Sequence, residues 1–586
     1  MFKGFVFFVK QGWKYDKLYI IWNVLYQLMN SLIPIIGILI PKFIIDELMG
    51  AKRPEKLFIY VAGLVGCTLI SSALSVYFSK DGFTRRGKVA AEFDHVMHRR
   101  LCMCDYENLE SPDFLDMREK ANKFLTCDYH GFGYLLDCAL NIIGQLLTLS
   151  GIITIIATYK IWIVILFVLL SLVGAMVETR EKKKAWVLSD AVVRDERGWQ
   201  YYCDLFESQE YAKEIRLNSM ANLLLRNERY FFERVLNNYR KQNNFFIKAG
   251  VVGSLLTCVR QCTAYGYLIY EVIAGAVNIG SFTMYISAIT AFASALSSVM
   301  DSISEIRTYD LYYDKLDQYL SVPTTLRQGK CRLEGKQHTI EFRHVSYRYP
   351  GSNIYALEDV NVVIHPGEKL LIVGENGAGK TTFIKLLTRL YDPTDGEILL
   401  DGTNIREIDY DWYMDLFSAV FQDFKLFPFS LKENVAIEQP ENPQHVENIL
   451  RNIGFGRRLD QLPKGLDTEI TKVFDEMGFE PSGGEGQKIS LARALYKNTD
   501  FVILDEPTAA LDPRAEFELY QNFSELVDGK TAVFISHRMG SAKFCDMIAV
   551  FSKGKIVEYG SHDALIKQSG MYSEYYKMQA EQYISY

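Results

Sequence analysis

Paired cysteine motifs are missing from this sequence, as are several other signals that would point to a function. The ten cysteines form no CxxC cluster, which argues against a zinc site. There is no low-complexity tract and no internal repeat. The net charge of -7 over 586 residues is modest and gives no argument for a nucleic-acid partner. The N-terminus lacks a short apolar core followed by a small-residue cleavage site, so its first apolar stretch is expected to be retained.

Long apolar runs are concentrated in residues 1–320, where they predict membrane-spanning helices. A span needs about 20 mostly apolar residues to cross the hydrocarbon core of a bilayer. Proline removes a backbone donor, so Pro34 and Pro41 predict that the first helix is kinked or ended there. The six candidate stretches are 18–43, 57–78, 140–158, 161–177, 246–275 and 279–300.

The distribution of lysine and arginine predicts the orientation of these spans. Basic residues precede the first span and gather after the second and fourth, as at Arg85, Arg86 and Lys183. Six spans place both termini on one side, and the positive-inside rule makes that side cytoplasmic. Lys52 and Arg53, in a short loop on the other side, are a mild exception. We expect a multi-pass protein of the cytoplasmic (plasma) membrane with both termini in the cytoplasm.

The connections after the second and fourth spans are long and polar. They contain few prolines and carry apolar pairs at helical spacing, such as Tyr202 with Phe206. A structureless loop of this length would be unusual in a compact protein. We expect the spans to continue into the cytosol as helices joined by short transverse helices, and the alternative is a flexible loop.

The character of the sequence changes after residue 320. Residues 321–338 form a polar linker with Pro323, Gly329 and Gly335. Beyond it, short β-rich runs alternate with helical stretches, which predicts a mostly parallel sheet with helices. The predicted fold class is therefore an all-α six-helix transmembrane domain in residues 1–320, followed by an α/β domain in residues 339–586.

A glycine loop at 374–382 is the strongest local signal. It follows the apolar run 369–373 and opens a helix, the context that a phosphate-binding loop (P-loop) requires. Its backbone N–H groups and the helix N-terminus suit phosphate oxygens. Lys380 is expected to neutralise the β- and γ-phosphates, and the Thr381 hydroxyl to bind Mg²⁺. The expected ATP contacts are Gly374, Asn376, Gly377, Ala378, Gly379, Lys380, Thr381 and Thr382.

A second signal is the apolar run 501–504, which ends in two carboxylates. Asp505 can hold the magnesium shell, and Glu506 can polarise the attacking water. Phosphoryl transfer needs charge neutralisation and an oriented nucleophile more than covalent help. A strand that ends in Asp-Glu is common and usually marks a solvated turn, but after a phosphate loop it indicates a P-loop NTPase.

Residues 482–487, Ser-Gly-Gly-Glu-Gly-Gln, resemble the signature motif of ATP-binding cassette (ABC) proteins, usually written LSGGQ. The other family motifs, before and after this segment, appear along the chain in the usual order. The resemblance implies that Tyr349 stacks on adenine, that Gln422 joins the metal site to the membrane domain, and that His537 is the switch histidine at the γ-phosphate. It places Asp512 in the loop that faces the partner's site.

The resemblance covers essentially the whole chain, because a membrane domain before the cassette is the order of the family's exporters. It implies a dimer with two ATP molecules, in which the signature of one cassette closes over ATP on the phosphate loop of the other. The partner is a second half-transporter, either a copy of this chain or a related one. The implied cofactors are ATP and Mg²⁺. The residues implied to meet the partner's ATP are Ser482, Gly483, Gly484 and Glu485, and those implied for the metal are Thr381, Gln422 and Asp505.

Two positions depart from the usual signature. Pro481 replaces leucine and Glu485 replaces glutamine. A carboxylate near a triphosphate is unfavourable unless a cation or a donor offsets it. The departure therefore bears on the strength of this half-site and leaves the predicted fold unchanged.

Polar residues inside the predicted spans have two interpretations. A charge in mid-membrane is costly and usually faces a cavity or a partner. Arg260, beside Gln261, therefore either lines a polar translocation path for an anionic or polar substrate or makes a structural bond between helices. The other polar residues of the spans are Gln27, Asn30, Asn141, Gln145 and Glu271.

The sequence thus predicts an ATPase coupled to transport, which exports an amphipathic peptide, lipid or drug-like solute. No peptidase domain with a Cys/His pair precedes the first span, so processing of a leader peptide by this chain is not expected. Two alternatives stay open. The same architecture can import metal-chelating compounds, and ATP can gate or sense rather than pump.

Overall fold

The computed structural model divides the chain into two compact units. Unit 1 comprises Met1–Cys102 and Pro112–Val322, and unit 2 comprises Met103–Ser111 and Pro323–Tyr586. The described residues are 3–126, 134–157, 189–335, 337–437, 442–506, 529–536 and 539–584, with scattered positions between 165 and 184.

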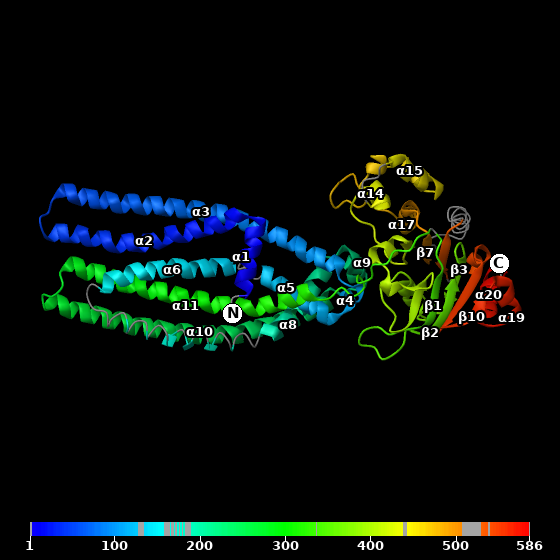
Figure 1. The fold of residues 1–586 in the computed structure, drawn as a ribbon, viewed down its shortest axis with the longest axis horizontal. Helices are drawn as coiled ribbons and strands as arrows, with labels where there is room; N and C mark the ends of the chain where they lie inside the picture. The colour runs from blue at the N-terminus through cyan, green and yellow to red at the C-terminus, as the bar shows by residue number, and fades with distance from the viewer. Residues whose placement is uncertain are drawn as a thin grey trace. The chain divides into compact units, whose positions relative to one another are not determined.

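Unit 1 consists of helices, and its long helices run side by side in Figure 1. Helices α2 and α6 pack against each other and against α11, while α10 packs against α8 and α11. The described helices are α1 (Lys3–Tyr15), α2 (Lys17–Met49), α3 (Pro54–Met103), α5 (Pro112–Thr126), α6 (Tyr134–Ala157), α8 (Ser189–Glu207), α9 (Gln209–Leu217), α10 (Ala221–Ile273) and α11 (Ile279–Ser321).

Five described helices are long and apolar enough to cross a membrane: α2, α3, α6, α10 and α11. They coincide with five of the six predicted spans. The sixth, 161–177, lies mostly outside the described residues. Of the two outcomes predicted for Pro34 and Pro41, an end of the helix is wrong, because α2 continues through both prolines to Met49. A proline inside a helix removes one hydrogen bond, and the rest of the turn can hold the helix together.

The predicted continuation of the helices beyond the spans is confirmed, and their place in the cytosol stays a prediction. Helix α3 has 50 residues and α10 has 53, more than a bilayer requires. Short helices follow or precede them, α4 (Tyr106–Glu110) after α3 and α9 before α10. The alternative of a flexible loop is therefore wrong for the described parts of both connections.

The start of α2 is fixed by charge. The Asp16 side chain caps the helix by accepting from the backbone N–H groups of Leu18 and Tyr19. Asp16 also pairs with Arg85 of α3 at 3.1 Å, and Arg85 pairs with Asp81 at 2.6 Å. Carboxylates at a helix N-terminus stabilise it. This network holds Tyr19 at the beginning of the apolar helix.

Two of the polar side chains predicted in the spans, Asn30 and Asn141, make hydrogen bonds between helices. The Asn141 amide of α6 donates to Ser298 at 2.9 Å and to Ser302 at 3.0 Å, both on α11. Asn30 of α2 accepts from Ser75 of α3 at 2.8 Å. These contacts support the structural interpretation for Asn30 and Asn141. Polar residues at helix contacts in a membrane are commonly used in this way.

Unit 2 contains two sheets. The larger has the strand order β10-β9-β3-β8-β7-β6, in which only β10 is antiparallel to its neighbour. The smaller is antiparallel, with the order β2-β1-β4-β5. The strands are β1 (Ile340–Tyr347), β2 (Leu357–Ile364), β3 (Lys369–Gly374), β4 (Asp395–Leu400), β5 (Thr403–Asn404), β6 (Phe417–Val420), β7 (Phe501–Asp505), β8 (Thr531–Ile535), β9 (Met547–Ser552) and β10 (Lys555–Gly560).

The larger sheet is buried on both faces. Leu370 and Ile372 of β3 belong to one hydrophobic cluster, and Leu371 and Val373 to the other. Side chains alternate between the faces of a strand, so an unbroken apolar run is what a doubly covered parallel strand requires. The mostly parallel sheet was predicted, and the antiparallel sheet was not.

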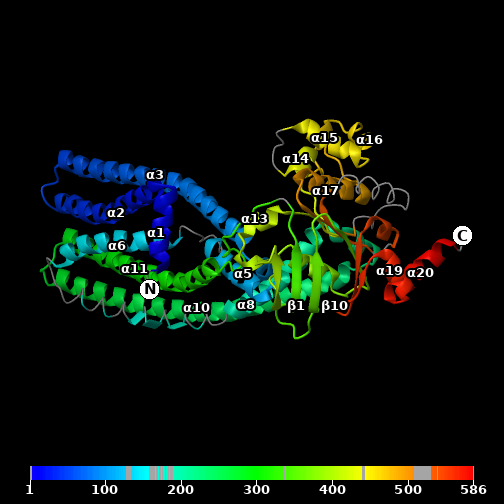
Figure 2. The ribbon, with the colours of Figure 1, turned by 45° about the vertical axis from the view of Figure 1, so that its right-hand side comes forward.

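A group of helices forms a separate layer of unit 2, as Figure 2 shows for α14, α15, α16 and α17. Helices α14 (Leu431–Ala436) and α15 (Pro443–Asn452) both pack on α17 (Gly483–Lys497), and α16 (Gly456–Leu459) packs on α15. The remaining helices are α12 (Lys380–Leu387), α13 (Tyr410–Asp415), α19 (His562–Gln568) and α20 (Met571–Ile584).

The short segment with α4 belongs to unit 2. Its Asp105 accepts from the backbone N–H and the hydroxyl of Thr325, both at 2.7 Å. Glu110 pairs with Lys385 of α12 at 3.2 Å and bonds the Tyr391 hydroxyl. Thr325 of the predicted linker is thereby hydrogen-bonded to Asp105, which lies in the connection between the second and third predicted spans.

Candidate nucleotide site

The glycine loop joins β3 to α12 with a backbone that only glycine accommodates easily. Gly374, Gly377 and Gly379 have φ values of 154°, 78° and 103°. A Cβ atom on Gly374 would lie 2.3 Å from the carbonyl oxygen of Phe551, and one on Gly379 would lie 2.8 Å from that of Ala356. The strand, loop and helix that the sequence predicted are all present.

Lys380 is the first residue of α12 and folds back over this loop. Its Nζ donates to the carbonyl oxygens of Gly374 and Glu375, both at 2.9 Å. The side chain is only 7% exposed. Burial lowers the pKa of this ammonium, while the carboxylates of Glu506 and Asp505 raise it. An ammonium held in this way can turn from carbonyl oxygens to phosphate oxygens with little loss of contacts.

Strand β7 carries the predicted carboxylates at its end. The Glu506 Oε2 atom accepts from the Gln422 amide at 2.9 Å, and its backbone carbonyl accepts from the Gln487 amide at 3.3 Å. The Glu506 backbone is left-handed, with φ 48°, and its N–H donates to Ile535 of β8 at 3.0 Å. Such a conformation is uncommon outside glycine and is often found at functional sites.

Asp505 lies in a strongly apolar and acidic setting. Its carboxyl is 4% exposed, at the end of a fully buried strand. Burial raises the pKa of Asp505 to about 6, and the Glu506 carboxylate adds to the rise, against the opposing effect of Lys380. A buried carboxylate that is costly to ionise gains most from a divalent cation.

The residues present suit Mg²⁺ bound with a nucleotide. Among the described residues no group of three His, Cys, Asp or Glu side chains could hold a metal ion. Mg²⁺ commonly takes one or two carboxylates, with substrate phosphates and waters completing the shell. Asp505, the Thr381 hydroxyl and the Gln422 amide oxygen provide donors of the required kind.

Tyr349 lies beside the phosphate-loop helix. Its hydroxyl is 3.0 Å from that of Thr382 in α12, and its ring packs edge-on against Tyr347 and Tyr391. Lys385 contacts the Tyr349 ring, 5.8 Å from its centroid. An aromatic ring in this cluster has the chemistry needed to stack on a nucleobase.

The signature segment begins α17, and its unusual Glu485 has a clear structural place. Ser482 is the N-cap and accepts from the Glu485 backbone N–H. One Glu485 carboxylate oxygen accepts from the Ser482 N–H at 2.8 Å and from its hydroxyl at 2.9 Å. The other oxygen pairs with Arg458 at 3.0 Å. The cation that should offset this carboxylate is therefore present.

The predicted residues of the glycine loop, Lys380, Asp505, Glu506 and Gln422 lie close together in the structure, and their roles stay predictions. Asp512 and His537 lie outside the described residues. Sequence reasoning missed Gln487 and Arg458. Gln487 is the last residue of the signature segment 482–487, so its place in the motif was a usable signal. Arg458 lies far upstream in α16, and nothing local marked it.

Comparison with known proteins matches both units. Residues 357–509 match a family model described as ABC transporter. The chain is 28% identical to the subtilin transport ATP-binding protein SpaT of Bacillus subtilis, over 94% of this chain and 90% of that protein. It is 27% identical to the nisin transport ATP-binding protein NisT of Lactococcus lactis, over 97% and 94%.

More distant or partial matches agree. An ATP-dependent lipid A-core flippase of Haemophilus ducreyi is 32% identical over 60% of this chain and 61% of that protein. A solved structure of a bacterial Atm1-family ABC exporter with ATP bound superimposes with a TM-score of 0.82 at 19% identity, covering 96% of this chain and 98% of that one. That likeness concerns the fold.

Proposed function

This chain is an ABC transporter, and we propose that it uses ATP to export an amphipathic solute across the cytoplasmic membrane as a dimer. It is a multi-pass membrane protein whose ATP-binding domain hydrolyses ATP in step with transport. One observation carries the proposal. Lys380, Asp505, Glu506 and Gln422 form a single cluster around the glycine loop, the charge arrangement needed for phosphoryl transfer.

The proposed roles follow from this cluster. Lys380 and the loop N–H groups hold the phosphates, and Tyr349 stacks on adenine. Glu506 accepts a proton from the attacking water, with Gln422 keeping its carboxylate in place. Mg²⁺, held by Thr381, Gln422 and Asp505, would neutralise charge on the β- and γ-phosphates. His537 is proposed to contact the γ-phosphate.

The second half of each site is proposed to come from another chain. Ser482, Gly483, Gly484 and Glu485 would meet the γ-phosphate bound by the partner, with Asp512 facing the same interface. ATP would favour the closed dimer only as far as it binds that state better than the open one. We propose residues 1–320 as the transmembrane domain, 321–338 as the linker and 339–586 as the cassette, with both termini cytoplasmic.

A peptide is the cargo class that the comparisons favour. The subtilin and nisin transport proteins match this chain over nearly its whole length, whereas the lipid A-core flippase matches over 60% of it. We propose an amphipathic peptide as the solute, with a lipid or a drug-like molecule as the alternatives.

Transport in membranes of known sidedness tests this proposal. Inside-out vesicles containing the protein should accumulate a fluorescent amphipathic peptide when MgATP is added outside. The Lys380→Ala variant should not. Uptake into right-side-out vesicles loaded with ATP would show import instead. A Glu506→Gln variant that abolishes hydrolysis and leaves function intact would show that ATP gates or senses.

A further inference from the structure

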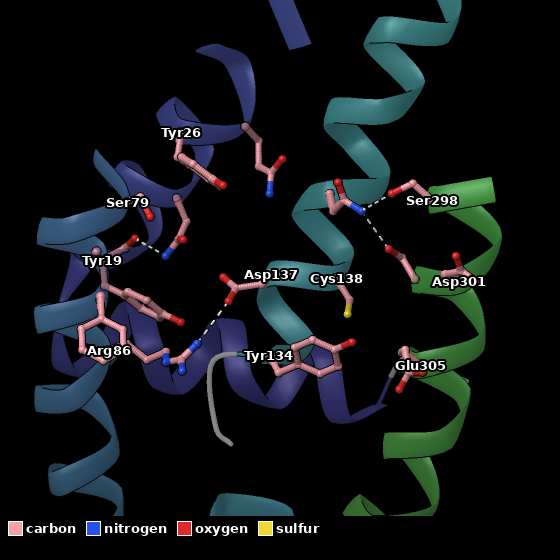
Figure 3. Close-up of a pocket in the computed structure, with 16 residues that line it drawn as sticks. Tyr19, Tyr26, Ser79, Arg86, Tyr134, Asp137, Cys138, Ser298, Asp301 and Glu305 are labelled. Atoms are coloured by element: carbon pink, nitrogen blue, oxygen red, sulfur yellow. Dashed lines mark hydrogen bonds and ion pairs between the residues drawn. The ribbon is translucent and has the colours of Figure 1, made fainter. Parts of the chain in front are cut away.

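Unit 1 holds a polar cavity of about 470 Å³ between α2, α3, α6 and α11, drawn in Figure 3. Its lining is hydrophilic for a site among apolar helices. Neutral amide and hydroxyl groups come from Asn23, Gln27 and Asn141 and from three serines. The charged and phenolic side chains are Tyr19, Tyr26, Arg86, Tyr134, Asp137, Asp301 and Glu305.

The charge of the cavity is negative. Three carboxylates line it, from Asp137, Asp301 and Glu305, and among the described residues of the lining only Arg86 is basic. Arg86 pairs with Asp137 at 3.3 Å, as the dashed line in Figure 3 shows. Three negative charges and one positive charge leave a formal charge of -2. Asp301 and Glu305 are one turn apart on α11, which places both on one face of that helix.

Tyr19 supplies an independent sign that a ligand belongs here. Its side chain is 1% exposed, and its hydroxyl has no hydrogen-bond partner among the described residues. Figure 3 shows the ring reaching into the cavity toward Asp137 and Arg86. A buried hydroxyl without a hydrogen-bond partner lowers the stability of the fold. The Tyr19 hydroxyl therefore suggests a hydrogen-bond partner on a bound ligand.

The cavity lies at one end of the apolar helices. Tyr19 is in the first turn of α2, Tyr134 is the first residue of α6, and the last candidate span ends at Arg307. With both termini cytoplasmic, as proposed above, this end faces the cytosol. A solute that leaves the cell would meet it first.

We propose that this cavity binds a cationic group of the transported solute, a primary ammonium or a guanidinium. The inference rests on the proposed function and names the charge of the cargo at this site. An ammonium carries three donors, which match carboxylate oxygens and the Tyr19 phenol oxygen. The rings of Tyr26 and Tyr134 add aromatic faces suited to a cation.

Arg260 belongs to a neighbouring cavity and does not line this one. That cavity has a volume of about 440 Å³ and includes Gln261 and Asp301 in its wall. Arg260 is buried and donates to Thr257, one turn before it on α10, at 3.1 Å. Asp301 lies in both walls, so Glu305 and Asp137 are the carboxylates exclusive to the proposed site.

The test compares two probes that differ in one charge. A fluorescent amphipathic peptide with a single lysine, and the same peptide acetylated at that lysine, are titrated into the full-length protein in lipid nanodiscs. A charge-assisted contact should give the lysine form about tenfold tighter binding. Glu305→Gln and Asp301→Asn should each reduce that preference, and together they should remove it. Equal binding of both peptides to the unaltered protein overturns the proposal.

Asp46→Asn is the matched control. Asp46 is on α2, near its other end, where its carboxylate accepts from Asn278 at 3.2 Å, and it does not line the cavity. Its neutralisation should leave the preference for lysine intact. A loss equal to that of Glu305→Gln would show that only the general negative charge of the protein matters, which would also overturn the site.

Tyr19→Phe separates a ligand role from a structural one. The hydroxyl has no partner in the described protein, so its removal should leave thermal stability unchanged or raise it. If the phenol contacts cargo, the same variant should bind the lysine peptide several-fold less tightly. Unchanged binding of both peptides excludes Tyr19 from the site and removes the observation on which the proposal depends.

Transport measurements keep this proposal distinct from export itself. ATP-driven uptake of both peptides into inside-out vesicles at equal rates would overturn the cationic site and leave export standing. Preferential binding of the lysine peptide without ATP-driven uptake would support the site and overturn export.

Discussion

At the scale of single residues, the raised pKa of Asp505 bears on the proposed Mg²⁺ site. Its pKa lies near 6 because the carboxyl is buried and faces Glu506, with Lys380 as the opposing charge. The ionised form is the one that can bind a metal, and it is also the form that burial disfavours. A cation bound at Asp505 would therefore stabilise the ionised carboxylate, whether or not nucleotide is bound.

The first prediction concerns Asp505→Asn. The folded protein raises the pKa from 3.8 to about 6, so the ionised carboxyl costs stability above pH 6 and this cost disappears as the pH falls toward 4. Near pH 7.5 the variant should therefore be more stable than the unaltered protein without nucleotide, by about 1–3 kcal/mol at most. Thermal unfolding in detergent measures this, and MgATP should stabilise only the unaltered protein.

The same group predicts a pH dependence of activity. ATP hydrolysis at fixed, limiting Mg²⁺ should fall as the pH drops through about 6, because protonated Asp505 is a poor metal ligand. Raising the Mg²⁺ concentration should shift that midpoint to lower pH. A pH midpoint that does not change with the Mg²⁺ concentration would show that a group other than Asp505 causes the loss of activity.

The substitution Glu506→Gln should separate ATP binding from ATP hydrolysis. Glu506→Gln preserves the size of the side chain that Gln422 contacts at 2.9 Å, but it cannot accept a proton. We expect the hydrolysis rate to fall about 10²–10⁴-fold, the usual contribution of a general base. ATP binding should persist, so filter-retained radiolabelled ATP measures occupancy. Rapid turnover by the variant would remove Glu506 from its proposed role.

At the scale of elements, the N-terminus of α17 shows why Glu485 is acceptable in a signature segment. The carboxylate completes a capping box with Ser482 and pairs with Arg458 of α16. A glutamine would turn an amide N–H₂ toward the guanidinium, where two donors would meet. Glu485 and Arg458 are therefore a matched pair across two helices of this layer.

A double-mutant cycle tests that pairing. In the proposed dimer, Arg458→Ala should leave an uncompensated carboxylate beside the partner's triphosphate and raise the KM for ATP by about three- to tenfold. Glu485→Gln should reduce the effect in the double variant, because the charge to be offset has gone. Additive losses, measured as ATPase KM over all four proteins, would show that the two residues act separately.

Much of the candidate site could be predicted from the sequence because its residues lie close together along the chain. Gly374, Lys380 and Thr381 lie on one strand–loop–helix unit, so their spacing alone predicts their arrangement. Arg458 and Tyr19 are different, because their importance depends on partners far along the chain or missing from it. The small antiparallel sheet was likewise not predicted, since β1 pairs with β4, whose paired residues lie 49 to 60 positions further along the chain, as well as with β2.

At the scale of the whole molecule, one chain carries both a phosphate loop and a signature segment. If each site is built from two chains, no variant can be understood from one chain alone. Lys380→Ala removes the phosphate contact from one half-site, and Gly484→Asp places a carboxylate in the other. Each variant, as a dimer with itself, should hydrolyse no ATP, because both of its sites contain the defect.

Mixed dimers of these two variants give the final prediction. A dimer of Lys380→Ala with Gly484→Asp has one site with both defects and one site with neither. When equal amounts are co-expressed, half of the dimers are mixed and each has one intact site of two, so about a quarter of the unaltered rate should return. Tandem affinity tags can isolate the mixed dimer and raise this to about half. A site contained within one chain would leave every mixture inactive, because each chain carries a defect of its own.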